Sequence, residues 1–422
     1  MRKFIIKGPN KAINGEVNIS GAKNSCLPLM AASILFKNKV TLKNVPLVKD
    51  VFTMKDLLVS LGAKVDISVS KKMMTITNAK KHKLTVPYNL VSTMRAGVLT
   101  MGPLLSRYPK KKIKVALGGG CALGVRDTNW HLAGFKSLGA KNSLQGGYVN
   151  ITTKKGLIGN EYKFPKVTVT GTSNLIMASI FASGKHYLKN ISIEPEVIDL
   201  IDFLKKSGAD IKFLGKRSIR INGIKELING NHTIIGDRIE AFSYLCVGAV
   251  TKGKIKINYI NTNHLRSEIG LLKKIGYKIE STNNTIKIST QKALKPVNFK
   301  TGPFPNFATD NMPMLLAVLA TVKGKSQIEE TIFSNRFMAA PELNRMGANI
   351  SIKKNKAIII GQKKLKSADC ISSDLRTTFS IILGAIAATG SSTISRIYHG
   401  LRGYYNLESK LRKVGVNIIS KA

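Results

Sequence analysis

The chain contains few acidic residues, few aromatic residues and few cysteines. Its 422 residues include 23 Asp and Glu, 6% aromatics, one Trp and four Cys. The cysteines lie far apart, without the close spacing that brings ligands to a metal or frames a disulfide-rich domain. They are Cys26, Cys121, Cys246 and Cys370. We therefore expect reduced thiols, no disulfide framework, no metal site and no cofactor.

Long hydrophobic runs are also missing. The most apolar stretches, Met314–Val322 and Phe379–Ala388, are too short to span a bilayer, so the sequence predicts core helices there. The first residues, Met1–Pro9, do not have the pattern of a secretion signal. We expect a cytoplasmic protein without membrane association.

Arginine is scarce within a strongly basic composition. The formal net charge is +44, yet only 14 of the 67 basic residues are Arg. The lysines are scattered along the whole chain, and the aromatic residues that would stack on single-stranded nucleic acid are few. The sequence has no helix-turn-helix, zinc-finger or RNP-type pattern. We therefore expect no nucleic-acid partner, whereas the positive charge suits small anionic substrates.

A short phrase built around a glycine recurs six times. In each case an amphipathic stretch such as Val197–Leu204 precedes the glycine, which is the preferred residue just beyond a helix C-terminus. Segments with period-two alternation follow, for example Asp210–Phe213 and then Ser218–Asn222. The recurring glycines are Gly62, Gly139, Gly208, Gly276, Gly347 and Gly415, separated by 77, 69, 68, 71 and 68 residues.

A second, more apolar helix and a short strand precede this pattern in most repeats, as at Asn174–Ser183 and His186–Ile191. One repeat is therefore predicted to have the order β-α-β-α-β-β. Repeats of this size favour duplication within compact domains over a solenoid, and the chain length favours two domains. Three repeats per domain would give two similar lobes.

The first twenty residues have no helix of their own. We expect them to form a strand pair, Lys3–Lys7 and Gly15–Ile19, that completes the lobe made by the C-terminal half. The predicted boundaries are 22–235 for the first lobe, and 1–21 with 236–422 for the second.

A glycine-flanked cysteine stands five residues before an arginine, in the stretch Gly118–Arg126. The glycines around Cys121 favour a pliable loop, and loops that close over substrates often carry the chemistry. A nearby guanidinium lowers the pKa of a thiol from its usual value of about 8.5, which favours a reactive thiolate or a poised proton donor. The alternative is a buried Cys used as a small apolar residue. Glycine spacing alone leaves both interpretations open.

Several separate phrases, in order along essentially the whole chain, together match one family. They are Ile19–Asn24, Thr93–Ala96, Gly118–His131, Asp237–Glu240, Thr309–Asp310, Glu330–Phe337, Asp374–Arg376, Arg396–His399 and Arg402–Tyr404. With them the chain resembles the enolpyruvyl transferases, and among these the ones that act on UDP-N-acetylglucosamine. The resemblance implies an α/β fold, a two-lobed inside-out α/β barrel of six β-α-β-α-β-β repeats, with helices faced by three four-stranded sheets in each lobe. It also implies an active site in the cleft between the lobes.

The implied reaction moves the enolpyruvyl group of phosphoenolpyruvate to the 3′-hydroxyl of UDP-N-acetylglucosamine and releases phosphate. It proceeds by addition and elimination through a tetrahedral ketal, as the first committed step of peptidoglycan synthesis. Arginine suits the carboxylate and the phosphate because its planar fork binds such groups bidentately. The resemblance assigns these contacts to Lys23, Arg126 and Arg402, with Arg95 and Arg376 assisting and Lys49 contributing more weakly. Arg336 is also implied to bind substrate.

Two further residues carry proton transfers by the same resemblance. Cys121 is implied to protonate C3 of the enolpyruvyl group; its thiol can also form a covalent phospholactoyl adduct and is the target of fosfomycin. Asp310 is implied to take the proton of the sugar hydroxyl, which needs a carboxylate within hydrogen-bond reach. The alternative for Asp310 is an N-cap of the helix that begins near Met312.

The sugar nucleotide is implied to contact residues of five segments. They are Asn24, Arg95, the loop Arg126, Asp127, Thr128, Asn129 and Trp130, the strand-to-helix turn Lys166, Val167, Thr168 and Val169, and the backbone near Ile332. The threonines Thr168, Thr170 and Thr172 cluster where free N–H groups favour a diphosphate, or alternatively cap the next helix. His131 and His399 are structural or secondary contacts.

The chain departs from the family pattern in several places. Asp127 and Asn129 replace the usual Pro and Asp after the loop arginine, and Ser334 and Leu401 stand where acidic residues are common. These exchanges bear on substrate affinity and loop closure more than on reaction type. The alternatives are a 5-enolpyruvylshikimate-3-phosphate synthase-like transferase, a basic nucleic-acid-binding protein, and a paralogue that binds without turnover. We expect a monomer that acts on small molecules.

Overall fold

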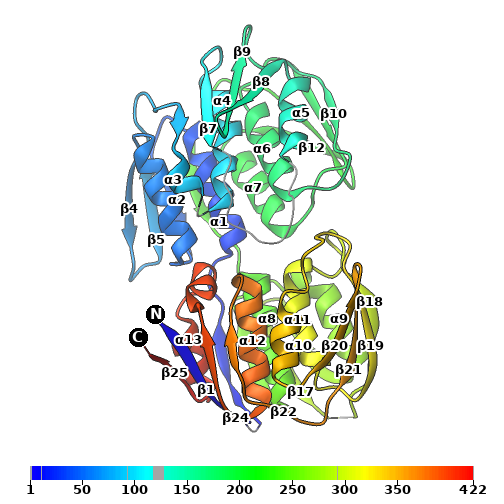
Figure 1. Ribbon diagram of the computed structural model, residues 1–422. Helices are drawn as coiled ribbons and strands as arrows, with labels where there is room; N and C mark the ends of the chain where they lie inside the picture. The colour runs from blue at the N-terminus through cyan, green and yellow to red at the C-terminus, as the bar shows by residue number, and fades with distance from the viewer. Residues whose placement is uncertain (1, 11, 93, 117–127, 292, 422) are drawn as a thin grey trace. The chain divides into compact units, whose positions relative to one another are not determined.

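The computed structural model of the chain describes residues 2–10, 12–92, 94–116, 128–291 and 293–421 (Figure 1). These residues divide into two compact units, each described by itself. One unit contains residues 21–116 and 128–235, and is called the N-terminal unit below. The other, the C-terminal unit, contains residues 2–20 and 236–421.

Helices and strands alternate along both units. In the N-terminal unit the elements are α1 (Lys23–Ala32), η1 (Ser33–Leu35), β3 (Val40–Lys43), α2 (Lys49–Ser60), β4 (Lys64–Ser68), β5 (Met73–Thr77), β6 (Thr85–Val86), α3 (Tyr88–Val91), η2 (Arg95–Thr100), α4 (Met101–Arg107), β7 (Ile113–Ala116), α5 (Asn129–Ser137), β8 (Ala140–Gln145), β9 (Tyr148–Thr153), β10 (Glu161–Lys163), α6 (Val169–Ser179), β11 (Lys185–Lys189), α7 (Pro195–Lys206), β12 (Asp210–Gly215), β13 (Ser218–Asn222) and β14 (Gly230–Thr233).

The C-terminal unit repeats this alternation and begins with two strands from the start of the chain. Its elements are β1 (Lys3–Gly8), β2 (Asn14–Asn18), α8 (Arg238–Thr251), β15 (Lys254–Asn258), η3 (Thr262–Leu265), α9 (Arg266–Ile275), β16 (Tyr277–Ser281), β17 (Thr285–Thr290), β18 (Asn298–Lys300), η4 (Thr309–Asn311), α10 (Met312–Leu319), β19 (Gly324–Glu329), α11 (Ala339–Arg345), β20 (Asn349–Lys353), β21 (Lys356–Gly361), β22 (Leu365–Lys366), β23 (Asp369–Ile371), α12 (Leu375–Ala387), β24 (Ala388–Ser395), η5 (Ile397–Arg402), α13 (Leu407–Lys413) and β25 (Ile418–Lys421).

Each unit contains three sheets with one shared topology. The sheets of the N-terminal unit have the orders β14-β3-β5-β4, β6-β7-β9-β8 and β10-β11-β13-β12. Those of the C-terminal unit are β16-β17-β15-β2, β18-β19-β21-β20 and β22-β24-β1-β25, the last with β23 also paired to β24. In every sheet one edge strand (β14, β6, β10, β2, β18 or β22) pairs in parallel with its neighbour, and the next two pairs are antiparallel. The predicted α/β fold of six repeats, three in each unit, is confirmed.

The six repeated glycines end six helices. They follow α2, α5, α7, α9, α11 and α13, and each has a φ between +82° and +115°. Such a positive φ is strained for a residue with a Cβ and costs glycine little, so glycine turns the chain from each helix toward its next strand. The predicted helix ends are confirmed at all six positions.

The most apolar helices form the core of each unit. All residues of α10 are buried, and α12 is buried from Arg376 to Ile386. With α8 they contribute to one hydrophobic cluster of the C-terminal unit. The predicted core helices at 314–322 and 379–388 are therefore confirmed, and among the described residues no helix combines the length and apolarity needed to cross a bilayer.

Strands distant in sequence complete one sheet of the N-terminal unit and two sheets of the C-terminal unit. β14 pairs in parallel with β3 in the N-terminal unit, and β2 pairs in parallel with β15 in the C-terminal unit. The expectation that the first two strands pair with each other is wrong. β1 lies between β24 and β25, whereas β2 joins another sheet, because each completes a different repeat.

Candidate active site

The structure describes most of the residues predicted to contact substrates. Cys121, Arg126 and Asp127 lie outside the described residues, and for Arg95 only the backbone, at the start of η2, is described. The other predicted residues fall into three groups, two in the N-terminal unit and one in the C-terminal unit.

The first group is at the beginning of α1. Lys23 is the first residue of this helix and is buried, with its ammonium 2.9 Å from Asp50 Oδ2. Asp50 is itself buried in the first turn of α2, where a carboxylate also suits the helix dipole. Lys49, beside it, is exposed, and Asn24 is half-buried. A buried ammonium held by a carboxylate has a fixed position at the beginning of the helix.

A buried hydrogen-bond network secures the same end of α1. Ser25 donates to Asp199 Oδ2, whose other oxygen lies 2.8 Å from His232 Nε2. Asp199 belongs to α7 and His232 to β14, so the network joins three elements around the residues that follow Lys23. The beginning of α1 is therefore held in place from outside the helix.

The second group combines the beginnings of α5 and α6. His131 is buried in α5, and its ring nitrogens lie 2.9 Å from Asn174 Nδ2 and 3.3 Å from Thr170 Oγ1, both in α6. These contacts bring Thr128, Asn129 and Trp130 beside the turn that begins α6. His131 thus has a structural role, which is one of the two roles expected for it.

The turn at 166–169 leads directly into α6. Lys166 is exposed, while Val167, Thr168 and Val169 are half-buried. Thr168 caps the helix, since its hydroxyl oxygen accepts from the Gly171 N–H at 3.3 Å.

Thr172 has a different structural task from Thr168. Its hydroxyl accepts from the Ser192 N–H at 3.0 Å, and its side chain is fully buried. Capping therefore applies to Thr168 and not to Thr172.

The third group surrounds Asp310 in the C-terminal unit. Asp310 Oδ1 is 2.5 Å from the Arg336 guanidinium, and Oδ2 is 3.1 Å from that of Arg376. Both arginine side chains are almost fully buried, whereas the Asp310 side chain is 26% exposed. One partly accessible carboxylate therefore lies between two buried cations.

The surroundings of Arg376 favour its positive charge, which would attract an anion. Burial works against the charge of Arg376, but the oxygens of Tyr404, Asp310 and Asp237 outweigh it and raise the pKa of the guanidinium. Asp374 caps α12 through the N–H groups of Arg376 and Thr377. Both effects hold Arg376 charged and fixed at the start of a core helix.

The alternative role of Asp310, as the N-cap of the following helix, is wrong. Asp310 lies within the short helix η4, and the N-cap position of α10 is Asn311, whose side chain makes no capping bond. The carboxylate instead pairs with Arg336 and Arg376, because charge-assisted bonds to guanidinium groups are stronger than a bond to a neutral N–H.

A residue without a predicted role connects Asp310 to the loop at Ile332. Glu330 is 3% exposed, and its Oε1 accepts from the Ile332 N–H at 2.7 Å. Its Oε2 accepts from the Thr309 hydroxyl at 3.0 Å. The backbone N–H of Ile332 is thus already engaged in this structure, while its side chain is 38% exposed.

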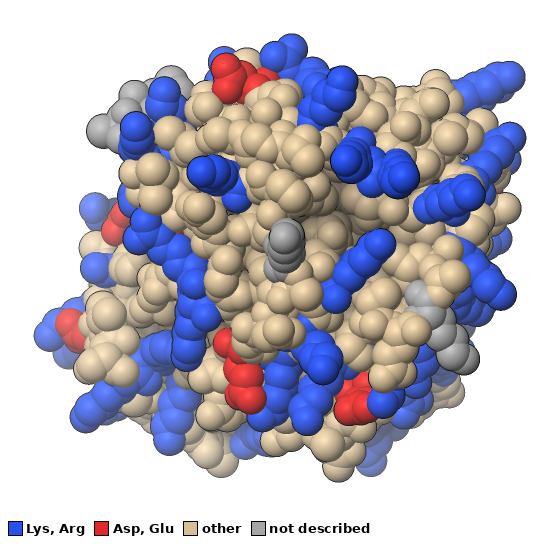
Figure 2. All heavy atoms as spheres, turned by 90° about the horizontal axis from the view of Figure 1, so that it is seen from below, with Lys and Arg blue, Asp and Glu red and all other residues tan. Residues whose placement is uncertain are grey.

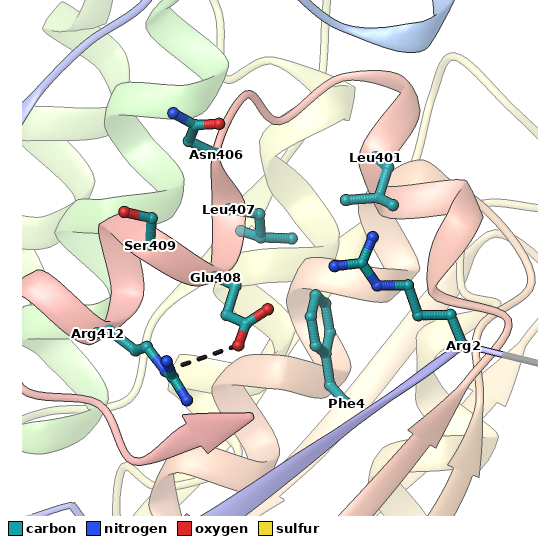
Figure 3. Close-up of a pocket in the computed structure, with 8 residues that line it drawn as sticks. All are labelled: Arg2, Phe4, Leu401, Asn406, Leu407, Glu408, Ser409 and Arg412. Carbon is teal, nitrogen blue, oxygen red and sulfur yellow. Dashed lines mark ion pairs between the residues drawn. The ribbon is translucent and has the colours of Figure 1, made fainter. Parts of the chain in front are cut away.

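Arg402 closes the short helix η5 and is half-buried. Its charge contributes, after burial, to lowering the pKa of His399 in the same element. A surface cavity of about 500 Å³ begins beside it at Leu401 (Figure 3). In Figure 3 the side chains of Phe4 and Leu407 lie at this cavity, with the Arg2 guanidinium near Leu401. Of the described residues predicted to bind substrate, none lines it.

The described cysteines are unsuited to chemistry. Cys26, Cys246 and Cys370 are buried free thiols. Burial, followed by the nearby Glu342 carboxylate, raises the pKa of Cys370 to about 12. Burial likewise raises the pKa of Cys26 and of Cys246. A thiol that reacts near neutral pH has to come from elsewhere in the chain.

Basic residues are spread over the face of the molecule drawn in Figure 2 rather than gathered in one patch. On the face drawn in Figure 2, lysines and arginines lie across the surface with acidic residues between some of them. Exposed ion pairs occur in both units, such as Lys37 with Glu226 and Lys278 with Glu280. A dispersed pattern of this kind is typical of a solvated basic surface.

The sequence of the chain is similar over nearly its full length to known proteins. A family model described as EPSP synthase (3-phosphoshikimate 1-carboxyvinyltransferase) matches residues 7–411. Relatives named UDP-N-acetylglucosamine 1-carboxyvinyltransferase include one from Pelagibacter ubique, 46% identical over 418 residues and matched over 99% of both chains. Another, from Acinetobacter baylyi, is 41% identical over 422 residues, again with 99% of both chains covered.

Solved structures show the same fold at low identity. The enolpyruvyl transferase NikO from Streptomyces tendae has a TM-score of 0.90 at 21% identity, covering 100% of this chain and 99% of that one. An EPSP synthase from Acinetobacter baumannii has a TM-score of 0.78 at 18% identity, with both chains fully covered. These two likenesses concern the fold alone.

Proposed function

Because the chain belongs to the UDP-N-acetylglucosamine 1-carboxyvinyltransferases, within the wider EPSP synthase family, we propose that it transfers the enolpyruvyl group of phosphoenolpyruvate to UDP-N-acetylglucosamine. The group goes to the 3′-hydroxyl, and phosphate is released. The observation that carries the proposal is Asp310, a partly exposed carboxylate held between two buried arginines. This is a position from which a carboxylate can serve as a base beside anionic substrates.

Addition is the first half of the proposed reaction. Asp310 accepts the proton of the sugar hydroxyl, and the oxygen of that hydroxyl forms a bond to C2 of phosphoenolpyruvate. C3 gains a proton, which we assign to Cys121, and the tetrahedral ketal results. Lys23 and Arg402, together with Arg126, bind the phosphate and the carboxylate.

Elimination is the second half. The C3 proton returns to the Cys121 thiolate left by the addition, the C2–O bond to phosphate breaks, and the enol double bond is restored on the sugar nucleotide. Asp310 then releases its proton to solvent. Arg336 and Arg376 favour this step because they stabilise negative charge on the neighbouring oxygens. No redox change occurs, and the atoms lost from phosphoenolpyruvate leave as inorganic phosphate.

The sugar nucleotide is assigned to the groups around α1, α5 and α6. Asn24 and the 128–130 segment contact the sugar and the base, and the turn at 166–169 contacts the diphosphate. Support comes from the His131 contacts that hold the last two segments together. We also propose that the protein works in the cytoplasm as a monomer without nucleic acid, because its substrates are small and its surface charge is dispersed.

The test is phosphate release from phosphoenolpyruvate by the purified chain with two acceptors in parallel. We expect release with UDP-N-acetylglucosamine and none with shikimate 3-phosphate. Release with shikimate 3-phosphate alone would replace the proposal by the EPSP synthase activity named in the family description. Release with neither acceptor, from folded protein, would point to a binding protein without turnover.

A further inference from the structure

Glu330 is a buried carboxylate with donors from two different segments. It follows β19, and its backbone N–H is fixed by the Asn355 carbonyl at 2.8 Å. Oε1 accepts from the N–H groups of Ile332 and Phe333, at 2.7 and 3.1 Å. Oε2 accepts from the Thr309 hydroxyl at 3.0 Å.

The two segments are those that carry Asp310 and Ile332. Thr309 belongs to η4 and directly precedes Asp310, and the Thr309 carbonyl accepts from Arg336 Nε at 3.0 Å. The other segment, 331–333, carries the exposed side chain of Ile332. A buried carboxylate that lost these donors would remain desolvated without compensation, so the bonds hold both segments firmly.

We propose that Glu330 is a positioning residue that sets the distance between the Asp310 carboxylate and the Ile332 segment. It thereby sets how the hydroxyl of the sugar nucleotide meets Asp310, the general base. The proposal rests on the proposed function, because it uses that reaction's acceptor. Glu330 contacts no reacting atom; it acts through Thr309 and through the N–H groups of residues 332 and 333.

Glu268 provides a matched comparison within the same unit. It is 2% exposed, and its Oε1 accepts from the Ala308 N–H and from Asn311 Nδ2, at 3.1 and 3.0 Å. It therefore holds residues 308 and 311, which flank Thr309 and Asp310 in the chain, and neither bond involves residues 331–333. Loss of Glu268 loosens one segment, whereas loss of Glu330 loosens both.

The kinetic experiment compares Glu330→Ala, Glu330→Gln and Glu268→Ala at a temperature where all are folded. For Glu330→Ala we expect kcat to fall about 10- to 100-fold, because a displacement near 1 Å costs that much. The KM for UDP-N-acetylglucosamine should rise while that for phosphoenolpyruvate stays within about twofold, because loss of the Ile332 segment weakens the acceptor alone.

The two other variants separate positioning from general stability. Glu330→Gln should recover most of both parameters, because the amide oxygen still accepts from two N–H groups and the amide NH₂ can donate to Thr309 Oγ1. Glu268→Ala should lower kcat without raising the acceptor KM. Equal changes in the two substrates' KM values, or an unchanged acceptor KM in Glu330→Ala, would overturn the proposal.

A second measurement does not depend on activity. Hydrogen exchange of a peptide spanning 330–337 reports the N–H groups of residues 332 and 333 directly. Exchange should accelerate in Glu330→Ala and stay unchanged in Glu268→Ala and in the surface control Glu329→Ala. Unchanged exchange in Glu330→Ala would overturn the positioning role even if the wild-type chain turned over. Accelerated exchange in a chain without turnover would leave the Glu330 contacts standing and reject the proposed reaction instead.

Discussion

Asp310 combines an accessible carboxylate with two buried partners. Its oxygens pair with Arg336 and Arg376, which are nearly inaccessible to water. A carboxylate held by two guanidinium groups keeps one orientation, and its partial exposure leaves it accessible to a substrate hydroxyl.

Asp310→Asn tests this role of the carboxylate. We expect kcat to fall at least about 100-fold, because a neutral amide cannot accept the hydroxyl proton. The fold should persist, since the amide oxygen can still accept from an arginine. Phosphate release and a thermal melt would be measured together. The exposed Asp66→Asn serves as control and should keep wild-type kcat; wild-type turnover in Asp310→Asn would remove Asp310 from the mechanism.

The cysteines give a second prediction at the residue scale. Because burial raises the pKa of Cys26, Cys246 and Cys370, none of them forms thiolate near neutral pH. Brief alkylation of native protein at pH 7.5 should therefore modify Cys121 first, with the other three reacting after unfolding. Peptide mass spectrometry identifies the modified thiol. Preferential labelling of any of the three buried cysteines would contradict this assignment.

Some residue roles were predictable from the sequence and others were not. Arg336 and Arg376 stand out because arginine is scarce in this chain and both fall inside matching phrases. The role of Glu330 depends on the approach of η4 to residues 331–333, which are more than twenty positions away from Thr309. No local pattern reports that approach. The capping expectation for Asp310 failed because two guanidinium groups from other elements compete for the carboxylate.

At the scale of elements, the repeated glycines are the strongest signal in the chain. Each ends a helix with positive φ, and a strand begins within a few residues. A glycine at a helix end is a local requirement, so the sequence reports it well. Sheet partners are not local, which is why the pairing expected for the first two strands was wrong and their separate sheets were not foreseen.

Two glycines of similar surroundings test the conformational argument. A Cβ at Gly347 or at Gly270 would meet no atom within 4 Å, but Gly347 has φ +82° whereas Gly270 lies within α9. Gly347→Ala should destabilise the protein by about 1–2 kcal/mol, since left-handed backbone penalises a Cβ. Gly270→Ala should stabilise it by about 0.5–1 kcal/mol. Urea unfolding measures both, and equal effects would contradict the argument.

His82 links the segment after β5 to the end of α4 and should make stability depend on pH. Its ring nitrogens lie 2.6 Å from the Tyr108 hydroxyl and 3.1 Å from Asn78 Oδ1. Burial, followed by the Arg107 charge, lowers the pKa of His82 to about 4. The unfolded chain titrates near 6.5, so between these values it binds the extra proton and the folded state loses stability as pH falls.

The expected loss from His82 is about 2 kcal/mol at pH 5 relative to pH 7. Urea unfolding of wild type and His82→Gln at both pH values measures it. The variant should be less stable than wild type at pH 7 yet lose less on acidification, because it has no imidazole to protonate. Identical pH dependence in the two proteins would contradict the assignment.

At the scale of the whole molecule, charge and fold carry different information. The formal charge of +44 suggests a polyanion partner when taken alone, yet the basic residues are dispersed and many of the acidic ones pair with lysine. The full-length match to UDP-N-acetylglucosamine 1-carboxyvinyltransferases and the Asp310 group point instead to small anions. The family was predictable from the sequence, because several separate phrases match it in order along essentially the whole chain.

The most direct measurement is proton NMR of the product formed from phosphoenolpyruvate and UDP-N-acetylglucosamine by the purified chain. We predict a new pair of vinyl proton signals on the sugar nucleotide, growing in step with inorganic phosphate and falling sharply in Asp310→Asn. Folded protein that gives no vinyl signals on the sugar nucleotide, with or without phosphate release, would contradict enolpyruvyl transfer to this acceptor.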